Sequence, residues 1–388
     1  MSKTTIAVIF GSRSAEHDVS IITAISTVIK PLELTGDFEV VPIYITKDGK
    51  WYSDNKLKDI KTYTSSSLSN LINKLKPITL QFNEGFCLIH PGLKNKITKI
   101  DIVFPATHGT YGEDGDLMGL LEMADVPYVG CDAASSVLCM DKVLARIIVG
   151  NENVIQNKYK WFYSNEFTNN KKTVLRKISK LKYPLFVKPT HLGSSIAISK
   201  VNNELQLTNA IELAVFYDDK VIVEEAVENL LEVTIPILGN DKLTIANTEE
   251  PNQGEKFFDF DTKYIREGKS KSNFSSGAKQ GAQGYSHIPA RINQKMQNEC
   301  KDIASKVYKA LGCSGIARVD LLIDKKTQNI YFNEINPMPG SLYAHNWNSI
   351  GISNIELVQN LVNLGFERYT EKQKKQTVFK TNFLKQFN

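Results

Sequence analysis

The fold is decided by residues 4–45, which read TTIAVIFGSRSAEHDVSIITAISTVIKPLELTGDFEVVPIYI. Residues 4–10 are an apolar run of strand length, and residues 39–45 form a second such run. Between them, residues 15–30 carry apolar side chains at helical spacing. A strand, a helix and a strand of these lengths predict a βαβ unit, in which the two strands are parallel. We therefore expect an α/β fold that begins with a parallel sheet.

The rest of the chain continues this pattern and then changes to a series of strands. A buried strand at 101–105 and a helix at 116–124 complete a first domain that ends near residue 135. A short strand is expected at 196–199, after a Gly/Ser loop. Strands dominate from 220 to 366, which predicts an α+β arrangement there. The elements expected in that part are strands at 231–238, 243–249, 315–323 and 329–335 and a long helix at about 291–311.

The composition fits a soluble protein of two or three domains. The chain has 388 residues, of which 42% are hydrophobic and 23% are charged. No apolar stretch approaches the ~20 residues of a membrane span, and the run at 4–10 is too short for a signal peptide. Five scattered cysteines form no CxxC pair or Cys/His cluster, which argues against a zinc site or a disulfide framework. We therefore expect a cytoplasmic protein.

The net charge of +5 is concentrated at the C-terminus. Residues 366–388 hold six Lys and Arg residues against two glutamates, so the rest of the chain is nearly neutral. A basic tail could contact nucleic acid or an acidic partner, or it could be a solvated and partly helical end. We give the tail no function, and we expect neither nucleic acid nor a membrane as a partner.

The strongest chemical pattern lies on two strands, GIARVDLLI at 315–323 and IYFNEIN at 330–336. Alternate residues of a strand share a face, so antiparallel pairing of these strands would gather their polar side chains on one face. Carboxylate and amide oxygens suit Mg²⁺, and an arginine beside them can hold an anion. A surface hairpin with a solvated polar face is the alternative. The polar side chains concerned are Arg318, Asp320, Glu334 and Asn336.

Two further segments have features of a nucleotide site. Lys188 emerges from a buried strand, and the turn Gly193-Ser194-Ser195 that follows could hold phosphate with its backbone N–H groups. The sequence has no Walker motif, and a Gly-Ser-Ser turn is common. The segment VIVEEAV at 221–227, with Glu232 beyond it, could bind a purine edge and a ribose, or it could be a solvated acidic turn.

Two loops follow strands of the opening sheet, where α/β proteins bind ligands. In the first loop, Glu16 could receive a substrate ammonium group, or it could only favour the dipole of the helix that begins there. The second loop, HGTYGEDG at 108–115, could hold a metal ion through His108 and its acidic residues. It could also be a loop held by its own hydrogen bonds.

Taken together, these segments resemble the D-alanine–D-alanine ligase family of the ATP-grasp superfamily. The motifs HGTYGEDG at 108–115, MDK at 140–142, VKP…GSS at 187–195 and RVD…NEIN at 318–336 occur in the family's order. The resemblance spans about residues 4–364. It implies a three-domain ATP-grasp fold, with a Rossmann-like preATP-grasp domain first and ATP gripped between the other two domains.

The resemblance implies a particular division of the chain. Residues 1–135 would form the N-terminal α/β domain on the substrate side, and 136–220 the central ATP-grasp subdomain. Residues 221–366 would form the C-terminal ATP-grasp domain, and 367–388 the basic tail. We expect a cytoplasmic homodimer that acts on D-amino acids and ATP.

The resemblance also implies an ATP site. Lysines would hold the phosphates, with Lys263 near the γ-phosphate, while the connector at 224–227 would take the adenine and Glu232 the ribose. Mg²⁺ or Mn²⁺, two ions in all, would join the site. The metal ligands would be Asp320, Glu334 and Asn336. The ATP-binding residues would be Lys142, Lys188, Ser195, Glu224, Glu225, Val227, Glu232 and Lys263.

The substrate site follows from the same resemblance. Glu16, Ser194 and Tyr264 match the family's hydrogen-bonded triad, in which Glu16 anchors the ammonium group of the first D-amino acid. Arg318 would stabilise the substrate carboxylate oxygen and later the oxyanion, together with the backbone of Gly340. The substrate-binding residues would be Glu16, His108, Gly340 and His345.

The implied reaction joins two D-alanine molecules for peptidoglycan synthesis. The carboxylate of the first attacks the γ-phosphate of ATP, and the amine of the second then attacks the acyl phosphate. The polar loop at 267–286 and Tyr264 would close over the site, since an acyl phosphate hydrolyses readily.

One departure from the family concerns the acceptor. His345 stands where a serine usually binds the carboxylate of the second substrate. A ligase of the same fold with a different acceptor amino acid is therefore a second hypothesis. A catalytically silent nucleotide-binding protein is a third, and the retained set of buried charges argues against it.

Overall fold

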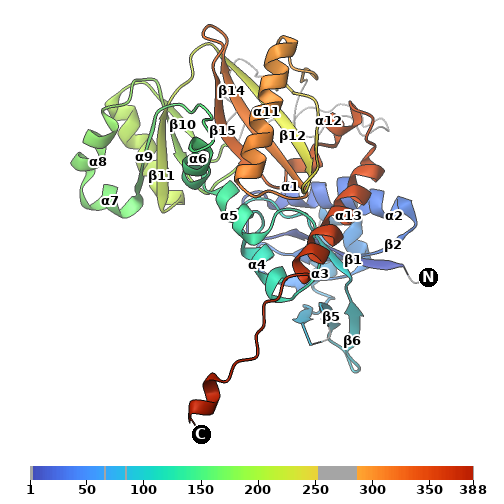
Figure 1. The fold of residues 1–388 in the computed structure, drawn as a ribbon. Coiled ribbons are helices and arrows are strands. Elements are labelled where there is room, and N and C mark those ends of the chain that lie inside the picture. The colour runs from blue at the N-terminus through green and yellow to red at the C-terminus, as the bar shows by residue number, and fades with distance from the viewer. Residues whose placement is uncertain (1–2, 65–66, 84, 252–285, 388) are drawn as a thin grey trace.

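The structure, a computed structural model, describes residues 3–64, 67–83, 85–251 and 286–387. Within these ranges the strands form three four-stranded sheets and one small three-stranded sheet. Figure 1 shows the first sheet and the C-terminal helix in the lower part of the molecule, with the second and third four-stranded sheets above them. None of the described helices is both long enough and apolar enough to span a bilayer.

The N-terminal sheet consists of β1 (Thr4–Gly11), β2 (Phe38–Ile45), β3 (Trp51–Tyr52) and β7 (Ile102–Pro105). Its order is β3-β2-β1-β7, and β1 is parallel to both β2 and β7. The predicted βαβ unit is therefore confirmed. The helical link from β1 to β2 contains α1 (His17–Ile22), the π-helical η1 (Thr23–Ile29) and α2 (Lys30–Thr35).

Both faces of this sheet are buried. Ile6, Val8 and Phe10 pack into one hydrophobic cluster, whereas Ala7 and Ile9 pack into another. This is the pattern of a parallel sheet covered on both sides, and it explains why β1 is apolar at consecutive positions instead of at alternate ones.

Shorter elements surround this sheet. A three-stranded antiparallel sheet has the order β4-β5-β6. Its strands are β4 (Thr79–Gln81), β5 (Cys87–His90) and β6 (Lys96–Lys99). The helices of this part are η2 (Asn55–Lys58), η3 (Ile60–Tyr63), α3 (Ser67–Ile72) and α4 (Asp116–Met123).

The second four-stranded sheet is antiparallel. It consists of β8 (Tyr159–Tyr163), β9 (Leu185–Pro189), β10 (Ser199–Val201) and β11 (Lys220–Glu225), in the order β10-β9-β11-β8. The helices α7 (Ser164–Asn169), α8 (Lys171–Ile178) and α9 (Glu204–Tyr217) share its hydrophobic core. The strand expected at 196–199 starts later than predicted, because Ser194, Ser195 and Ala197 have positive φ and form a turn.

The third four-stranded sheet carries the strands of the strongest motif. It consists of β12 (Leu230–Gly239), β13 (Leu243–Ile245), β14 (Ile316–Asp324) and β15 (Ile330–Asn336), in the order β13-β12-β14-β15. One face packs against α11 (Gln294–Ala310) and α6 (Lys142–Gly150) in a single hydrophobic cluster. The preceding helix, α5 (Ala133–Met140), links this part to the first sheet.

The last long helix of the chain packs against the N-terminal sheet. After η5 (Gly340–Tyr343) and α12 (Ala344–Asn348), helix α13 (Asn354–Gln373) packs into the same core as β1. The approach is close at Gly365, where a Cβ atom would lie 2.9 Å from the carbonyl oxygen of Tyr128. The tail then leaves the body of the molecule (Figure 1) and ends in the exposed 3₁₀-helix η6 (Phe383–Phe387).

Candidate active site

The paired strands β14 and β15 bring the predicted oxygen donors together. Asp320 lies opposite Glu334 and Arg318 lies opposite Asn336, so the antiparallel pairing expected from the sequence is confirmed. A β-bulge at Asp320 shifts the register, and the pairing skips Asn333. The polar face of a two-stranded ladder thus presents two carboxylates, an amide and a guanidinium group.

Arg318 and Asp320 form a bidentate ion pair. The Nε and Nη2 atoms of Arg318 donate to the two carboxylate oxygens of Asp320 at 2.7 and 2.6 Å. Burial raises the pKa of Asp320 to about 6, although Arg318 acts in the opposite direction, and the nearby charge of Glu334 contributes to the rise. The two neighbouring carboxylates of Asp320 and Glu334 therefore favour the binding of a cation between them.

This donor set fits magnesium. Magnesium binds through one or two carboxylates and leaves the rest of its shell to water and substrate phosphates. Asp320 and Glu334 provide the carboxylates, and Asn336 provides the amide oxygen at the end of β15. Among the residues that the structure describes, no group of three or more His, Cys, Asp or Glu side chains is arranged to hold a metal ion by itself.

Lys188 projects from β9 toward this ladder. Its Nζ atom lies 3.2 Å from Oδ1 of Asn333, the residue that the bulge leaves out of register, and it also forms an ion pair with Glu224 of β11. Burial would raise the pKa of Glu224, but the charges of Arg146 and Lys188 lower it below its ordinary value. Glu224, one of the predicted ATP-binding residues, is therefore a buried counter-ion of two cations.

Arg146 is a participant that sequence reasoning missed. It lies in α6 and donates to Glu224 at 2.6 Å and to Oδ1 of Asn157 at 2.8 Å. It is almost fully buried. The feature that could have revealed it is an arginine at the centre of the otherwise apolar run VLARIIV at 143–149.

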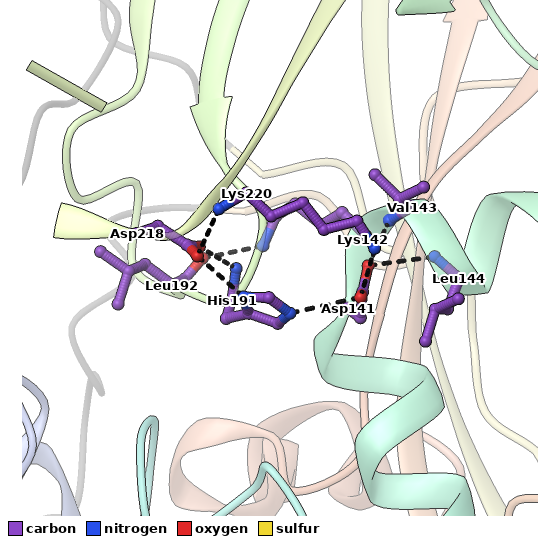
Figure 2. A network of polar contacts seen from close by, with 8 residues as sticks. All are labelled: Asp141, Lys142, Val143, Leu144, His191, Leu192, Asp218 and Lys220. Atoms are coloured by element: carbon purple, nitrogen blue, oxygen red, sulfur yellow. Dashed lines mark hydrogen bonds and ion pairs between the residues drawn. The ribbon is translucent and has the colours of Figure 1, made fainter. Parts of the chain in front are cut away.

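Lys142 approaches the same ladder from the first turn of α6. Its Nζ atom donates to the carbonyl oxygen of Leu192 at 2.8 Å and lies 3.6 Å from Oε2 of Glu334. The two lysines predicted to hold phosphate therefore both reach the β14–β15 ladder. The network that supports Lys142 is shown in Figure 2 and includes His191, Asp218 and Lys220, which the sequence did not single out.

Glu16 meets the Gly/Ser loop of the second sheet. The hydroxyl group of Ser194 donates to a carboxylate oxygen of Glu16, which joins two of the three predicted triad members. Glycines line this contact, since a Cβ atom at Gly109 or Gly193 would lie 2.8 or 2.9 Å from Oε2 of Glu16. The third predicted member, Tyr264, lies outside the described residues, as do Lys263 and most of the 267–286 loop.

The loop at 108–115 is held by its own hydrogen bonds. The backbone N–H of Gly109 donates to Oε2 of Glu113 at 2.8 Å, and His108 Nδ1 lies 3.7 Å from the other oxygen of that carboxylate. His108 Nε2 contacts the hydroxyl group of Thr23 at 2.9 Å. Burial would lower the pKa of His108, but Glu113 and Glu16 raise it above its ordinary value. Of the two interpretations of this loop, the geometry supports the self-bonded one.

His345 pairs with a buried carboxylate. Its Nε2 atom lies 2.9 Å from Oε2 of Glu249, which also accepts a bond of 3.0 Å from the side chain of Asn346. Burial would raise the pKa of Glu249, but His345 lowers it below its ordinary value. Gly340 begins the short helix η5, and the next residue, Ser341, donates its N–H to Thr23 at 3.0 Å.

The remaining predicted nucleotide residues lie on or near the same two sheets. Glu225 ends β11 and accepts the backbone N–H of Lys182 at 2.9 Å, and Val227 follows in the connector. Glu232 lies on β12 opposite Leu322 of β14. Its charge contributes to the raised pKa of Asp320, although less than burial does.

Comparisons with known proteins cover nearly the whole chain. A profile described as D-ala D-ala ligase N-terminus matches residues 5–131, and one described as D-ala D-ala ligase C-terminus matches residues 148–363. A D-alanine–D-alanine ligase of Chloroherpeton thalassium is 38% identical over 382 residues, which are 96% of this chain and 99% of that protein. One of Thermosipho africanus is 37% identical over 384 residues, 97% of each chain.

Solved structures that resemble this chain are also ligases named for their action on D-alanine. The VanG D-Ala:D-Ser ligase from Enterococcus faecalis has a TM-score of 0.76 and 34% identity, with 94% of this chain and all of that chain covered. The D-alanine-D-alanine ligase from Coxiella burnetii has a TM-score of 0.77 and 26% identity, with 96% of this chain and 97% of that chain covered. These likenesses show the α/β ATP-grasp fold that was expected from the sequence, and in this chain a parallel first sheet is followed by antiparallel sheets.

Proposed function

Because the chain belongs to the D-alanine–D-alanine ligase family, we propose that it joins two D-alanine molecules in an ATP-dependent reaction. The product, D-alanyl-D-alanine, would serve peptidoglycan synthesis. One observation carries the assignment of the site. Lys142 and Lys188 approach the β14–β15 ladder at the level where Asp320 faces Glu334. Cations and metal-binding carboxylates are the two parts that a triphosphate site requires.

The first step would be phosphoryl transfer to a carboxylate. Lys142 and Lys188 bind the phosphates, and Glu16 receives the ammonium group of the first D-alanine. Arg318 orients the substrate carboxylate toward the γ-phosphate. Two of the five N–H donors of its guanidinium group bind Asp320, which leaves others for the substrate.

The metal would be held by Asp320, Glu334 and Asn336, and it would neutralise phosphate charge as that charge moves toward the leaving group. We propose Mg²⁺ or Mn²⁺, with two ions bound. Glu224 is a shared counter-ion of Arg146 and Lys188, so this group of three side chains keeps one positive charge in excess, which favours a phosphate beside Lys188.

The second step would be attack by an amine. The amine of the second D-alanine adds to the carbonyl carbon of the acyl phosphate, and the tetrahedral oxyanion is stabilised by Arg318 and the backbone N–H of Gly340. The C–O bond to phosphate then breaks, and the proton that the amine loses can pass to the departing phosphate. The remaining residues in the proposed ATP site are Ser195, Glu225, Val227, Glu232 and Lys263, and Tyr264 would complete the triad with Glu16 and Ser194.

A ligase with a different acceptor is the second candidate, and His345 is the observation that favours it. This histidine occupies the position of the usual acceptor-binding serine and is paired with Glu249. One of the similar solved structures, VanG, is a D-Ala:D-Ser ligase. His108 and Gly340 would line the substrate site in either case.

A phosphate-release assay across pairs of D- and L-amino acids separates these candidates. Strong activity with D-alanine alone supports D-alanyl-D-alanine synthesis, whereas activity only when a second amino acid is added supports the other acceptor. Release of no phosphate with any pair, while MgATP still binds, would favour the catalytically silent protein. We also propose a cytoplasmic homodimer, which sedimentation equilibrium of the full chain tests.

A further inference from the structure

A compact ionic network supports the start of α6 (Figure 2). The two ring nitrogens of His191 face two carboxylates, with Nδ1 at 2.9 Å from Oδ1 of Asp218 and Nε2 at 3.2 Å from Oδ2 of Asp141. Lys220 donates to the same oxygen of Asp141 at 2.7 Å. The network joins the end of α5, the loop after β9, the end of α9 and the start of β11.

The network is balanced in charge. Both carboxylates are buried, and His191 is the more exposed member, with 44% of its side-chain surface accessible. A ring with an acceptor at each nitrogen carries a proton on both. The hydrogen bonds to Asp141 and Asp218 accordingly raise the pKa of His191 to about 9. Two cations and two anions therefore face one another at neutral pH.

The network surrounds the contacts that fix Lys142. Asp141 is the N-cap of α6 and accepts the backbone N–H groups of Val143 and Leu144 at 2.9 and 3.0 Å. Lys142 then makes two bonds to the loop that carries His191. Its backbone N–H donates to the carbonyl oxygen of Thr190 at 3.3 Å, and its Nζ atom donates to that of Leu192 at 2.8 Å.

His191 thus lies in sequence between Thr190 and Leu192, whose carbonyl groups bind Lys142. Its side chain also contacts Asp141, the residue before Lys142. Its backbone N–H is fixed as well, through a bond of 2.6 Å to Oδ2 of Asp218. Without the ring, the loop at 190–192 would lose its bond to Asp141, the N-cap of α6, and its side-chain bond to Asp218. Lys220 would still hold Asp141, and the two bonds of Lys142 itself would still join the loop to the start of α6.

We propose that His191 is a positioning residue for nucleotide binding, which links Asp218 to Asp141 and so holds Lys142 where a phosphate group is bound. The inference rests on the proposed function only through the assignment of Lys142 to phosphate. In this proposal His191 acts through Lys142 and not by contact with a substrate, and the resemblance to the family gave it no role.

Three variants separate the two bonds of the ring. His191→Ala removes both. In His191→Asn the amide nitrogen lies near the place of Nδ1 and can reach Asp218, whereas in His191→Gln it lies near the place of Nε2 and can reach Asp141. His90→Ala, in β5 of the small sheet, is the matched control for loss of a histidine away from the site.

The measurements are the Kd of MgATP by calorimetry on the full chain, the KM values for ATP and D-alanine, and the thermal midpoint. We expect His191→Ala to raise the Kd and the KM of ATP about tenfold, with the KM of D-alanine within about twofold. His191→Gln should recover most of the loss, whereas His191→Asn should resemble the alanine variant. His90→Ala should match the wild type.

An unchanged Kd for MgATP in His191→Ala would overturn the proposal. It would also be overturned if all KM values and the thermal midpoint change together and glutamine gives no recovery, since that is the behaviour of a purely structural histidine. A wild-type protein that binds MgATP but does not ligate D-alanine would defeat the proposed function, and the Kd series would still decide the role of His191.

Discussion

The first and third sheets of this molecule differ in what their strands place on the two faces. β1 and β7 hold no charged residue and are buried on both faces. In β14, Ala317, Val319, Leu321 and Ile323 face the hydrophobic core beside α11, and the alternate residues Arg318 and Asp320 face the other way. The charges on this second face form a largely buried ion pair beside Tyr343 of η5, and the same face holds the proposed chemistry.

The largest expected effect comes from removing one charge on the polar face of the third sheet. Glu334→Gln keeps the shape of the side chain but removes a proposed metal ligand. We expect kcat to fall by about 10³-fold or more while the thermal midpoint changes by only about 2 °C. Steady-state phosphate release and differential scanning calorimetry measure the two quantities. Rates like those of the wild type would defeat the metal assignment.

The opposite result is expected for the buried first sheet. Ile6→Ala leaves a cavity in a fully buried position of β1 and should lower the free energy of unfolding by about 3 kcal/mol. The folded fraction should keep its kcat/KM within about twofold, because the hydrophobic cluster in which Ile6 packs includes none of the proposed site residues. Urea unfolding and a ligase assay at low temperature test the pair of effects. Loss of activity without loss of stability would contradict the division between the two sheets.

The smallest expected effect extends the comparison to the second sheet, where the His191 network lies at the end of β9 and the start of β11. The pKa of His191 rises from its ordinary 6.5 to about 9 in the folded protein through its bonds to Asp141 and Asp218. The stabilisation is therefore fully present below pH 6.5 and is lost as the pH rises through about 9. Since the ring is 44% exposed, solvent screens the effect, and we expect about 1 kcal/mol.

Urea unfolding of the wild type and His191→Gln at pH 6 and pH 10 measures the stabilisation that the protonated ring of His191 contributes. The wild type should lose about 1 kcal/mol more than the variant over that interval. Equal losses in the two proteins would show that the ring does not stabilise the folded state through its charge. Asp141, Asp218, Lys142 and Lys220 are present in both proteins, so the two proteins differ only in the side chain at position 191.

Local patterns were sufficient to predict the parts of the molecule that depend on neighbours in sequence. The βαβ start and the pairing of Asp320 with Glu334 follow from strand periodicity and from a short connection between two strands. The late start of β10 was not predictable from apolar residues alone, because positive φ at Ser194 and Ser195 keeps the chain in a turn.

The ionic networks could not be predicted from the sequence, for a different reason. Asp141, His191 and Asp218 come from three separate segments, and no periodicity of one segment constrains its contact with another. Arg146 and Glu224 are far apart in sequence in the same way. Resemblance to a family supplied roles for the residues expected to contact ATP, metal and substrate, and it supplied none for Arg146, His191, Asp218 and Lys220.

Helix α13 has a consequence for how the molecule is made. Its residues Leu357 and Leu361 share one core with Ile6 and Ile102 of the first sheet, and Gly365 lets the helix reach the backbone at Tyr128. The strands β1 and β7 therefore lack one side of their core until α13 has been synthesised. Expressed alone, the N-terminal segment would expose that apolar face to solvent and aggregate, so the first domain to begin folding is among the last to finish.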